Sequence, residues 1–258
     1  MKKNVVKVLL TLMSITKILI MVITIAMAGL LVIYESKIPK AYKDNKFLAE
    51  TPCEGEVTIY GLKVKINSEE LFIPSKLGKY NVTKIGKQSY SSKKELQNIT
   101  RYYIPNTANE VLYDFFEHSN DNTQIFYTGE MNGITNLLKK IINKNRNIRI
   151  YIPGDYYDEY FSTNTNNYEN YIFKANVVYY MNYLEEDYYY VDYYENGEKI
   201  KYEPLAPSRK DYKFDGWYLE SDCLNKWCFH SDVVDTTGEN KTVKLYAKWI
   251  EVQKNNTN

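Results

Sequence analysis

Two cysteines and a histidine are the residues of this sequence best suited to chemistry. Cys223, Cys228 and His230 lie in the stretch YKFDGWYLESDCLNKWCFHSD, residues 212–232, which also holds two of the three tryptophans. Cys228 and His230 are two residues apart, so they would share one face of a strand. A nucleophilic Cys–His pair needs an orienting third group, and none is apparent nearby. We therefore predict a packing role for this stretch and no catalytic residue; whether Cys223 and Cys228 form a disulfide stays open.

Metal binding is the alternative for the same three side chains. A structural zinc site takes about four ligands, whereas this stretch offers three without a recognised spacing. Glu185, Glu186 and Asp187 could present oxygen ligands to calcium, but they lack a calcium-loop signature. No HExxH, GxSxG or glycine-rich phosphate-binding pattern occurs. We predict no bound metal, no cofactor and no enzyme activity.

Tyrosine is unusually abundant, with 27 tyrosines against 9 phenylalanines. In YLEEDYYYVDYYENGE, residues 183–198, strand alternation would turn Tyr189, Val191 and Tyr193 inward. The alternate residues would then face outward: Tyr188, Tyr190, Asp192 and Tyr194. Rigid amphipathic rings can bind sugars or peptides at low entropic cost, so these four form a candidate ligand face. The alternative is a tyrosine-rich strand whose phenols are merely solvated.

A hydrophobic run near the N-terminus governs the predicted location. ILIMVITIAMAGLLVIY, residues 18–34, is uncharged and would span about 26 Å as a helix. Residues 1–50 carry eight lysines against three acidic residues, and the lysines that precede the run place the rest of the chain outside the cell. We predict an uncleaved signal anchor that crosses the cell membrane once through residues 18–34. Ala26-Met27-Ala28 offers the alternative of a cleaved signal peptide, which would leave the body secreted.

Short units that begin with Ile-Pro follow a polar linker, residues 35–56. IPSKLGKYNVTKIGKQSY begins at Ile73, IPNTANEVLYDFF at Ile104, and a third Ile-Pro lies at Ile152. These units resemble BspA-type leucine-rich repeats, with a short strand and a turn in each. The resemblance covers residues 57–165 and implies a degenerate solenoid whose units bury their apolar faces by stacking. Within it, the apolar run ITNLLKKII predicts a helix.

The C-terminal part carries a second resemblance. NGEKIKYEPLAPSRKDYKFDGWYLE, the later KWCFHSDVV and the closing TVKLYAKW are similar to the internalin-type B repeat, also called the Listeria–Bacteroides repeat. The matching positions include Gly216, Trp217, Trp227, Tyr246 and Trp249. The resemblance implies a small β-grasp-like domain over residues 172–251 of an exported bacterial protein, followed by a polar tail, residues 252–258. The aromatic residues of the opening stretch are then expected to form the core of this domain.

The predicted fold is α+β and mostly β, with an N-terminal transmembrane helix over residues 1–34, a short repeat solenoid and a β-grasp-like domain. Beyond residue 50 the chain carries 25 basic and 29 acidic residues, which does not suit a nucleic-acid-binding protein. We expect a membrane-anchored surface protein with non-catalytic binding or adhesion modules for an extracellular protein or glycan. The alternatives are a structural spacer of the cell envelope and, more weakly, a glycan-acting enzyme. The sequence does not determine the ligand or the oligomeric state.

Overall fold

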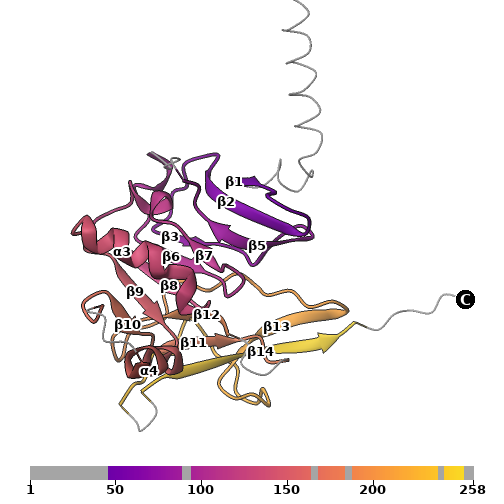
Figure 1. Ribbon diagram of the computed structural model, residues 1–258. Helices are drawn as coiled ribbons and strands as arrows, with labels where there is room; N and C mark the ends of the chain where they lie inside the picture. Colours follow the sequence, from indigo (N-terminus) through magenta and orange to yellow (C-terminus); the bar gives the residue numbers. More distant parts are fainter. Residues whose placement is uncertain (1–45, 89–93, 164–167, 184–187, 238–240, 253–258) are drawn as a thin grey trace, which may run out of the picture. The chain divides into compact units, whose positions relative to one another are not determined.

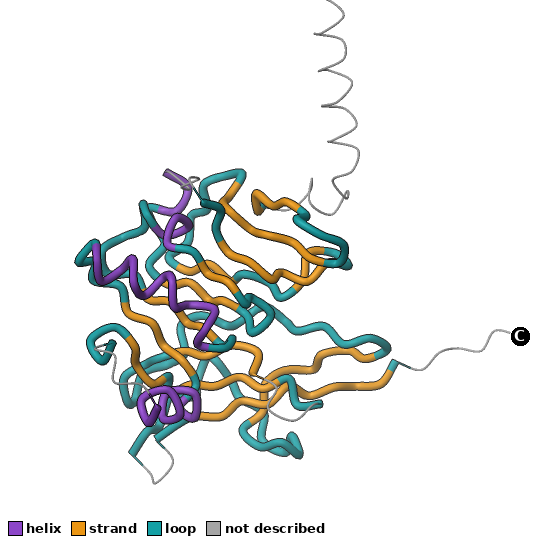
Figure 2. Tube along the Cα trace, in the orientation of Figure 1, coloured by secondary structure: helices purple, strands orange, loops and turns teal. Residues whose placement is uncertain are grey.

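The computed structural model is mostly β with few helices (Figures 1 and 2). It describes residues 46–88, 94–163, 168–183, 188–237 and 241–252. All of these residues belong to one compact unit, Lys46–Asn258.

The first sheet has a mixed pairing pattern. β2 pairs in parallel with β5, and β5 pairs in parallel with β7, while β1 and β4 add antiparallel strands to β2 and β5. Buried aliphatic side chains such as Val57, Ile59 and Val82 fix its inner face. The strands are β1 (Phe47–Glu50), β2 (Glu56–Leu62), β4 (Lys76–Leu77), β5 (Tyr80–Ile85) and β7 (Glu110–Val111).

The second sheet is a stack of five parallel strands in the order β10-β9-β8-β6-β3. Each strand comes from a successive stretch of the chain, so the strands lie side by side as the units of a solenoid do. The strands are β3 (Glu70–Phe72), β6 (Arg101–Ile104), β8 (Gln124–Tyr127), β9 (Arg149–Ile152) and β10 (Ile172–Lys174).

Register in this parallel sheet places like residues in rows, because side chains alternate between the two faces of each strand. One row lies inside the solenoid and is fully buried: Leu71, Tyr102, Ile125, Ile150 and Ile172. Two rows lie on the opposite face. The polar row contains Glu70, Arg101, Gln124 and Arg149, and the aromatic row contains Phe72, Tyr103, Phe126, Tyr151 and Phe173. Adjacent rings of the aromatic row lie 4.0 to 5.6 Å apart between centroids.

Short helices connect the strands of the solenoid. The helix predicted from ITNLLKKII is confirmed as α3 (Thr135–Asn143), which buries Leu137, Leu138 and Ile141. A second helix, α4 (Gly154–Thr163), follows the third Ile-Pro unit. The 3-10 turns are η1 (Lys94–Leu96), η2 (Tyr113–Phe116) and η3 (Met131–Ile134).

The C-terminal sheet has four strands in the order β12-β11-β14-β13. Its two central strands, β11 and β14, are parallel, and each has an antiparallel outer partner. The buried core side chains include Val178, Trp217 and Leu245. The strands are β11 (Val177–Tyr180), β12 (Tyr188–Asp192), β13 (Tyr212–Tyr218) and β14 (Val243–Glu251).

The aromatic row of the solenoid and the C-terminal sheet share one hydrophobic core. Phe72, Tyr103, Phe126 and Tyr151 belong to the same buried cluster as residues of β11, β12 and β14. The Tyr190 ring of β12 lies 5.3 Å from Phe72 and 6.1 Å from Tyr103 between centroids. Burying this aromatic surface drives the association of the two parts.

The predicted fold class and location require correction. The structure is mostly β, and within the described residues no helix is both long and apolar enough to cross a membrane. The predicted anchor, residues 18–34, lies outside the described residues. The transmembrane helix and the single-pass location are therefore not supported.

The predicted domain boundaries also differ from the structure at two places. The C-terminal domain predicted over residues 172–251 starts too early, because β10 pairs with β9 in the five-stranded parallel sheet and the C-terminal sheet begins with β11. The linker expected over residues 35–56 begins outside the described residues, but its described part holds strand β1. Phe47 in this strand is buried, because β1 pairs with β2 and adds to the core of the first sheet. The sequence gives no clear strand signal here, because the residues around β1 are polar and include two prolines.

Candidate functional site

The four residues of the predicted ligand face are buried. Tyr188, Tyr190, Asp192 and Tyr194 have exposed fractions of 7%, 0%, 0% and 7%. The predicted alternation of side chains along β12 is correct, since Tyr189 on the other face of the strand stacks against Trp217 in the core of the C-terminal domain. The predicted outward face is wrong because the solenoid sheet covers Tyr190 and Asp192, and Asp155 and Tyr156 of helix α4 contact Tyr188. The Tyr190 hydroxyl donates a hydrogen bond of 2.8 Å to the Ile73 carbonyl of the solenoid.

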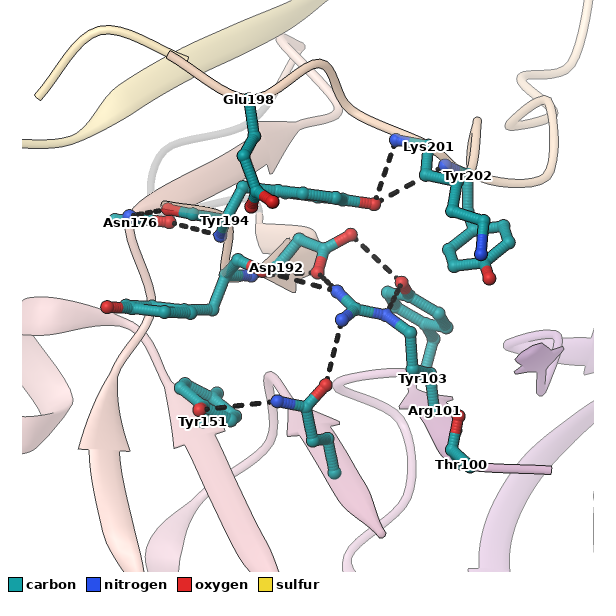
Figure 3. Close-up of polar contacts among 12 residues, drawn as sticks. Thr100, Arg101, Tyr103, Tyr151, Asn176, Asp192, Tyr194, Glu198, Lys201 and Tyr202 are labelled. Carbon is teal, nitrogen blue, oxygen red and sulfur yellow. Dashed lines mark hydrogen bonds and ion pairs between the residues drawn. The ribbon is translucent and has the colours of Figure 1, made fainter. Parts of the chain in front are cut away.

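A buried ion pair crosses the contact between the two sheets. Arg101 begins β6 in the polar row, and Asp192 ends β12. The Arg101 guanidinium donates through Nη2 to Asp192 Oδ1 and through Nη1 to Gln124 Oε1 at 2.8 Å. Its Nε donates to the Tyr103 hydroxyl at 3.1 Å, as Figure 3 shows. Arg101 thus ties together two strands of the solenoid and the edge of the C-terminal sheet.

Asp192 has a partner for each of its carboxylate oxygens. Besides Arg101, Oδ1 accepts the backbone N–H of Tyr193 at 2.7 Å, and Oδ2 accepts the Tyr103 hydroxyl at 2.9 Å. Burial raises the pKa of Asp192 to about 6, because loss of hydration outweighs the Arg101 charge and these hydrogen bonds. The carboxyl is inaccessible to a ligand from solvent.

Aromatic rings surround the Arg101 guanidinium. Its centre lies 4.6 Å from the Phe126 ring centroid and 5.0 Å from that of Tyr194. Burial alone would lower the pKa of Arg101, but the negative Asp192 and the neighbouring tyrosine hydroxyls raise it, so the group stays charged. Cation–π attraction in this desolvated position adds to the ion pair.

A groove of about 1170 Å³ lies beside this ion pair. Its floor includes three members of the polar row, Arg101, Gln124 and Arg149, together with Asn122. Its wall is the chain that follows β12, residues 193–203. Phe229 and His230 from the cysteine-containing stretch also line the groove, as do Glu69, Thr100 and Tyr151.

Two tyrosines present partly exposed rings in the groove. Tyr193 stacks on Tyr151 with ring centroids 5.0 Å apart, and its hydroxyl donates to Glu195 Oε1 at 3.3 Å. The Tyr202 hydroxyl donates to Glu69 Oε2 at 2.9 Å, and Lys201 forms a salt bridge with the same carboxylate. Figure 3 shows Lys201 and Tyr202 at the end of the chain segment that forms the wall. Packing and hydrogen bonding therefore hold these rings in place before any ligand arrives.

The cysteine-containing stretch packs as the core of the C-terminal domain, as its aromatic content predicts. Trp217 and Trp227 are buried, and Phe214 lies 5.9 Å from Trp249 between ring centroids. Tyr246 stacks on Tyr180 at 5.0 Å. These pairs link neighbouring strands of the sheet.

The thiols of this stretch are free. Burial raises the pKa of Cys223, whereas a hydrogen bond from Ser231 and nearby backbone N–H groups lower that of exposed Cys228. Among the described residues, no three His, Cys, Asp or Glu side chains gather in a group that could hold a metal ion. The calcium alternative at residues 185–187 lies outside the described residues.

Sequence reasoning missed Arg101, Gln124 and Arg149. Each is the first residue of a strand in a successive unit, two positions before a buried aromatic: Tyr103, Phe126 and Tyr151 respectively. This recurring pattern of a polar residue two positions before an aromatic residue could have predicted a polar row beside an aromatic row. The pairing of Arg101 with Asp192 had no local signal, because the two residues belong to different parts of the fold.

Comparison with known protein families identifies one part of the chain. No curated protein and no solved structure matches the chain. The BspA-type leucine-rich repeat resemblance of residues 57–165 is not shown and stays a prediction. Residues 176–248 match the model of the Listeria-Bacteroides repeat domain, so the C-terminal part of this chain is a domain of the kind found in bacterial surface proteins.

Proposed function

We propose that this chain is a non-catalytic binding protein of the bacterial surface and that the groove between the solenoid and residues 193–203 is its ligand site. The match to the Listeria-Bacteroides repeat domain supports a location at the bacterial surface. The observation that carries the proposal is the polar row on the groove floor. Successive strands present Arg101, Gln124 and Arg149 in register along one line.

The repeat architecture supports an extended binding surface. β6, β8 and β9 are parallel neighbours that begin at Arg101, Gln124 and Arg149, so each unit adds one position to the groove floor. Stacked units of this kind form long faces suited to binding. We infer that residues 57–165 are degenerate leucine-rich repeats of the BspA type, on the strength of these parallel strands and of the Ile-Pro units.

Two carboxylates near the groove, Asp192 and Glu69, are poorly suited to general acid catalysis. General acid catalysis needs a carboxyl of raised pKa within reach of the substrate. Asp192 has a raised pKa but is fully buried with both oxygens bonded. Glu69 is exposed, and hydrogen bonds from Tyr202 and Lys201 lower its pKa. Neither of these two carboxyls is suited to act as the general acid, and this favours the binding proposal over glycan hydrolysis.

A spacer is the second candidate function. The shared aromatic core and the Arg101–Asp192 pair join the solenoid directly to the C-terminal sheet. Such a joint would resist bending, as a structural element of the cell envelope requires. The spacer needs no ligand, so the two functions differ in whether the groove binds anything.

Binding to immobilised extracellular proteins and glycans by the full chain tests the proposal. The groove variant Arg149→Ala/Tyr193→Ala removes a polar-row side chain and an exposed ring. The matched control is Lys213→Ala/Tyr157→Ala, which alters one exposed cation and one partly exposed tyrosine that do not line the groove. We expect the groove variant alone to lose binding. Equal binding by both variants, or no binding by the unaltered chain, would favour the spacer.

A further inference from the structure

The groove floor offers both donors and acceptors of hydrogen bonds: Arg101 and Arg149 only donate, whereas the amides of Gln124 and Asn122 can do both. Neighbouring strands are about 4.8 Å apart, so the polar row repeats at that interval. Gln124 is held by Arg101 on its oxygen and by the Tyr151 hydroxyl, 3.4 Å from its amide nitrogen. Arg149 is exposed and has no ion-pair partner within the described part of the chain. Its guanidinium lies 5.9 Å from the Phe173 ring centroid, and its N–H groups can donate to a ligand in the groove.

Charges around the groove balance each other. The lining contains four cations, Arg101, Arg149, Lys199 and Lys201. It also contains four acids, Glu69, Glu195, Glu198 and Glu203. Lys201 and Glu69 already form a salt bridge with each other at 3.1 Å. A strongly anionic or cationic ligand would meet as many like charges as opposite ones, so the groove favours an uncharged ligand.

The groove lacks the features by which proteins usually capture peptides. β6, β8 and β9 each lie between two neighbours in the sheet, so none of them has a free edge for an added strand. The lining contains a single aliphatic side chain, Ile200, which is itself buried. The apolar surface of the groove therefore comes from aromatic rings such as Tyr193 and Phe229, and the lining offers no cluster of aliphatic side chains to anchor a helix or strand.

We propose that the groove binds a neutral polysaccharide that runs along the polar row, across the starts of β6, β8 and β9. This inference rests on the proposed binding function and names its ligand class. Sugar hydroxyls both donate and accept, which matches the mixture of Arg149, Gln124, Glu195 and Glu198. The apolar face of a sugar ring packs on a rigid aromatic surface, and Tyr193, supported by Tyr151, provides one in the wall.

Glycan binding by the full chain tests this inference. The probes are neutral glucans, mannans and galactans, with hyaluronate and polygalacturonate as anionic probes and a random peptide library as the protein probe. At least one neutral polysaccharide should bind, and both Arg149→Ala and Tyr193→Ala should weaken its binding by about tenfold or more. Tyr193→Phe keeps the ring and should retain most of the affinity, and Lys213→Ala should bind as the unaltered chain does.

Salt dependence separates the neutral class from the charged ones. Affinity for a neutral polysaccharide should change by less than about twofold between about 0.05 and 0.5 M salt, because screening acts on charged ligands. Binding of anionic probes alone, or failure of every neutral polysaccharide to bind, overturns the inference. Peptide binding that is lost in Arg149→Ala would overturn the ligand class while leaving the proposed function intact. Binding that no groove variant affects would overturn both.

Discussion

Arg101 and Asp192 lie 91 positions apart in the sequence, yet their side chains form a buried ion pair that joins the solenoid to the C-terminal domain. The Asp192 side chain is 1% exposed and that of Arg101 14%. Tyr103 bonds to both partners, with its hydroxyl accepting from Arg101 Nε and donating to Asp192 Oδ2. The pair therefore has the hydrogen bonds that a buried charge requires.

Removing one partner of this pair should destabilise the protein more than removing both. Arg101→Met or Asp192→Leu leaves one buried charge without its partner, which should lower the free energy of unfolding by about 3–5 kcal/mol. Arg101→Met/Asp192→Leu replaces both charges with apolar groups and should lose less than either single variant. Urea unfolding followed by tryptophan fluorescence measures these differences.

An exposed ion pair provides the control for this series. Lys174 and Asp158 are 50% and 66% exposed, so Lys174→Met should change the free energy of unfolding by less than about 1 kcal/mol. If the losses of the two buried single variants simply add in the double variant, the two charges are not energetically coupled.

The pKa of Asp192 predicts a pH dependence of stability. An aspartate in an unfolded chain has a pKa of about 3.9, whereas burial raises the pKa of Asp192 to about 6 in the folded protein. The folded state binds this proton more tightly, so the stabilisation is fully present below about pH 4 and is lost as the pH rises through about 6.

Asp192→Asn isolates this titration from that of other groups. Between about pH 4 and 7, the free energy of unfolding of the unaltered chain should fall relative to that of Asp192→Asn by up to about 3 kcal/mol. Denaturant unfolding at a series of pH values measures both profiles. Parallel profiles over this range would show that Asp192 does not titrate as its buried environment implies.

Two buried tyrosines of the same core should respond differently to loss of the hydroxyl. The Tyr190 hydroxyl donates to the Ile73 carbonyl at 2.8 Å, whereas the Tyr179 hydroxyl has no hydrogen-bond partner among the described residues. Tyr190→Phe should cost about 1–3 kcal/mol of unfolding free energy, because a buried carbonyl loses its donor. Tyr179→Phe should be neutral or stabilising. Equal losses in thermal unfolding would contradict the hydrogen-bond assignment.

Gly86 should tolerate alanine less well than Gly55 does. Both have positive φ angles, +92° and +82°, so each substitution carries the same kind of backbone strain. A Cβ at Gly86 would lie 2.9 Å from Leu112 Cβ, while a Cβ at Gly55 meets nothing within 4 Å. Gly86→Ala should therefore lose about 1–3 kcal/mol more than Gly55→Ala, measured by chemical unfolding. Similar losses would mean that the Leu112 loop moves aside without cost.

The repeating units and the C-terminal strands could be predicted from the sequence because their signals are local. Alternating apolar residues around the Ile-Pro units and in TVKLYAKW reflect the two faces of a strand, and adjacent residues carry that information. Trp217 and Trp227 were likewise placed in a core from their neighbours and from the family resemblance. The short strand β1 was missed because its pairing with β2 outweighs its polar flanks.

The outcome at β12 required the tertiary structure. Alternation separated Tyr189 and Val191 from Tyr188, Tyr190, Asp192 and Tyr194, but it could not say what covers the second set. The aromatic row of the solenoid covers Tyr190 and Asp192, and that row arises only when strands from separate units come into register. The ion pair and the groove depend on the same association. Which residues share a face follows from adjacent positions and can be read from the sequence. Which faces are buried depends on a partner distant in the chain, so it emerges only when the two sheets pack together.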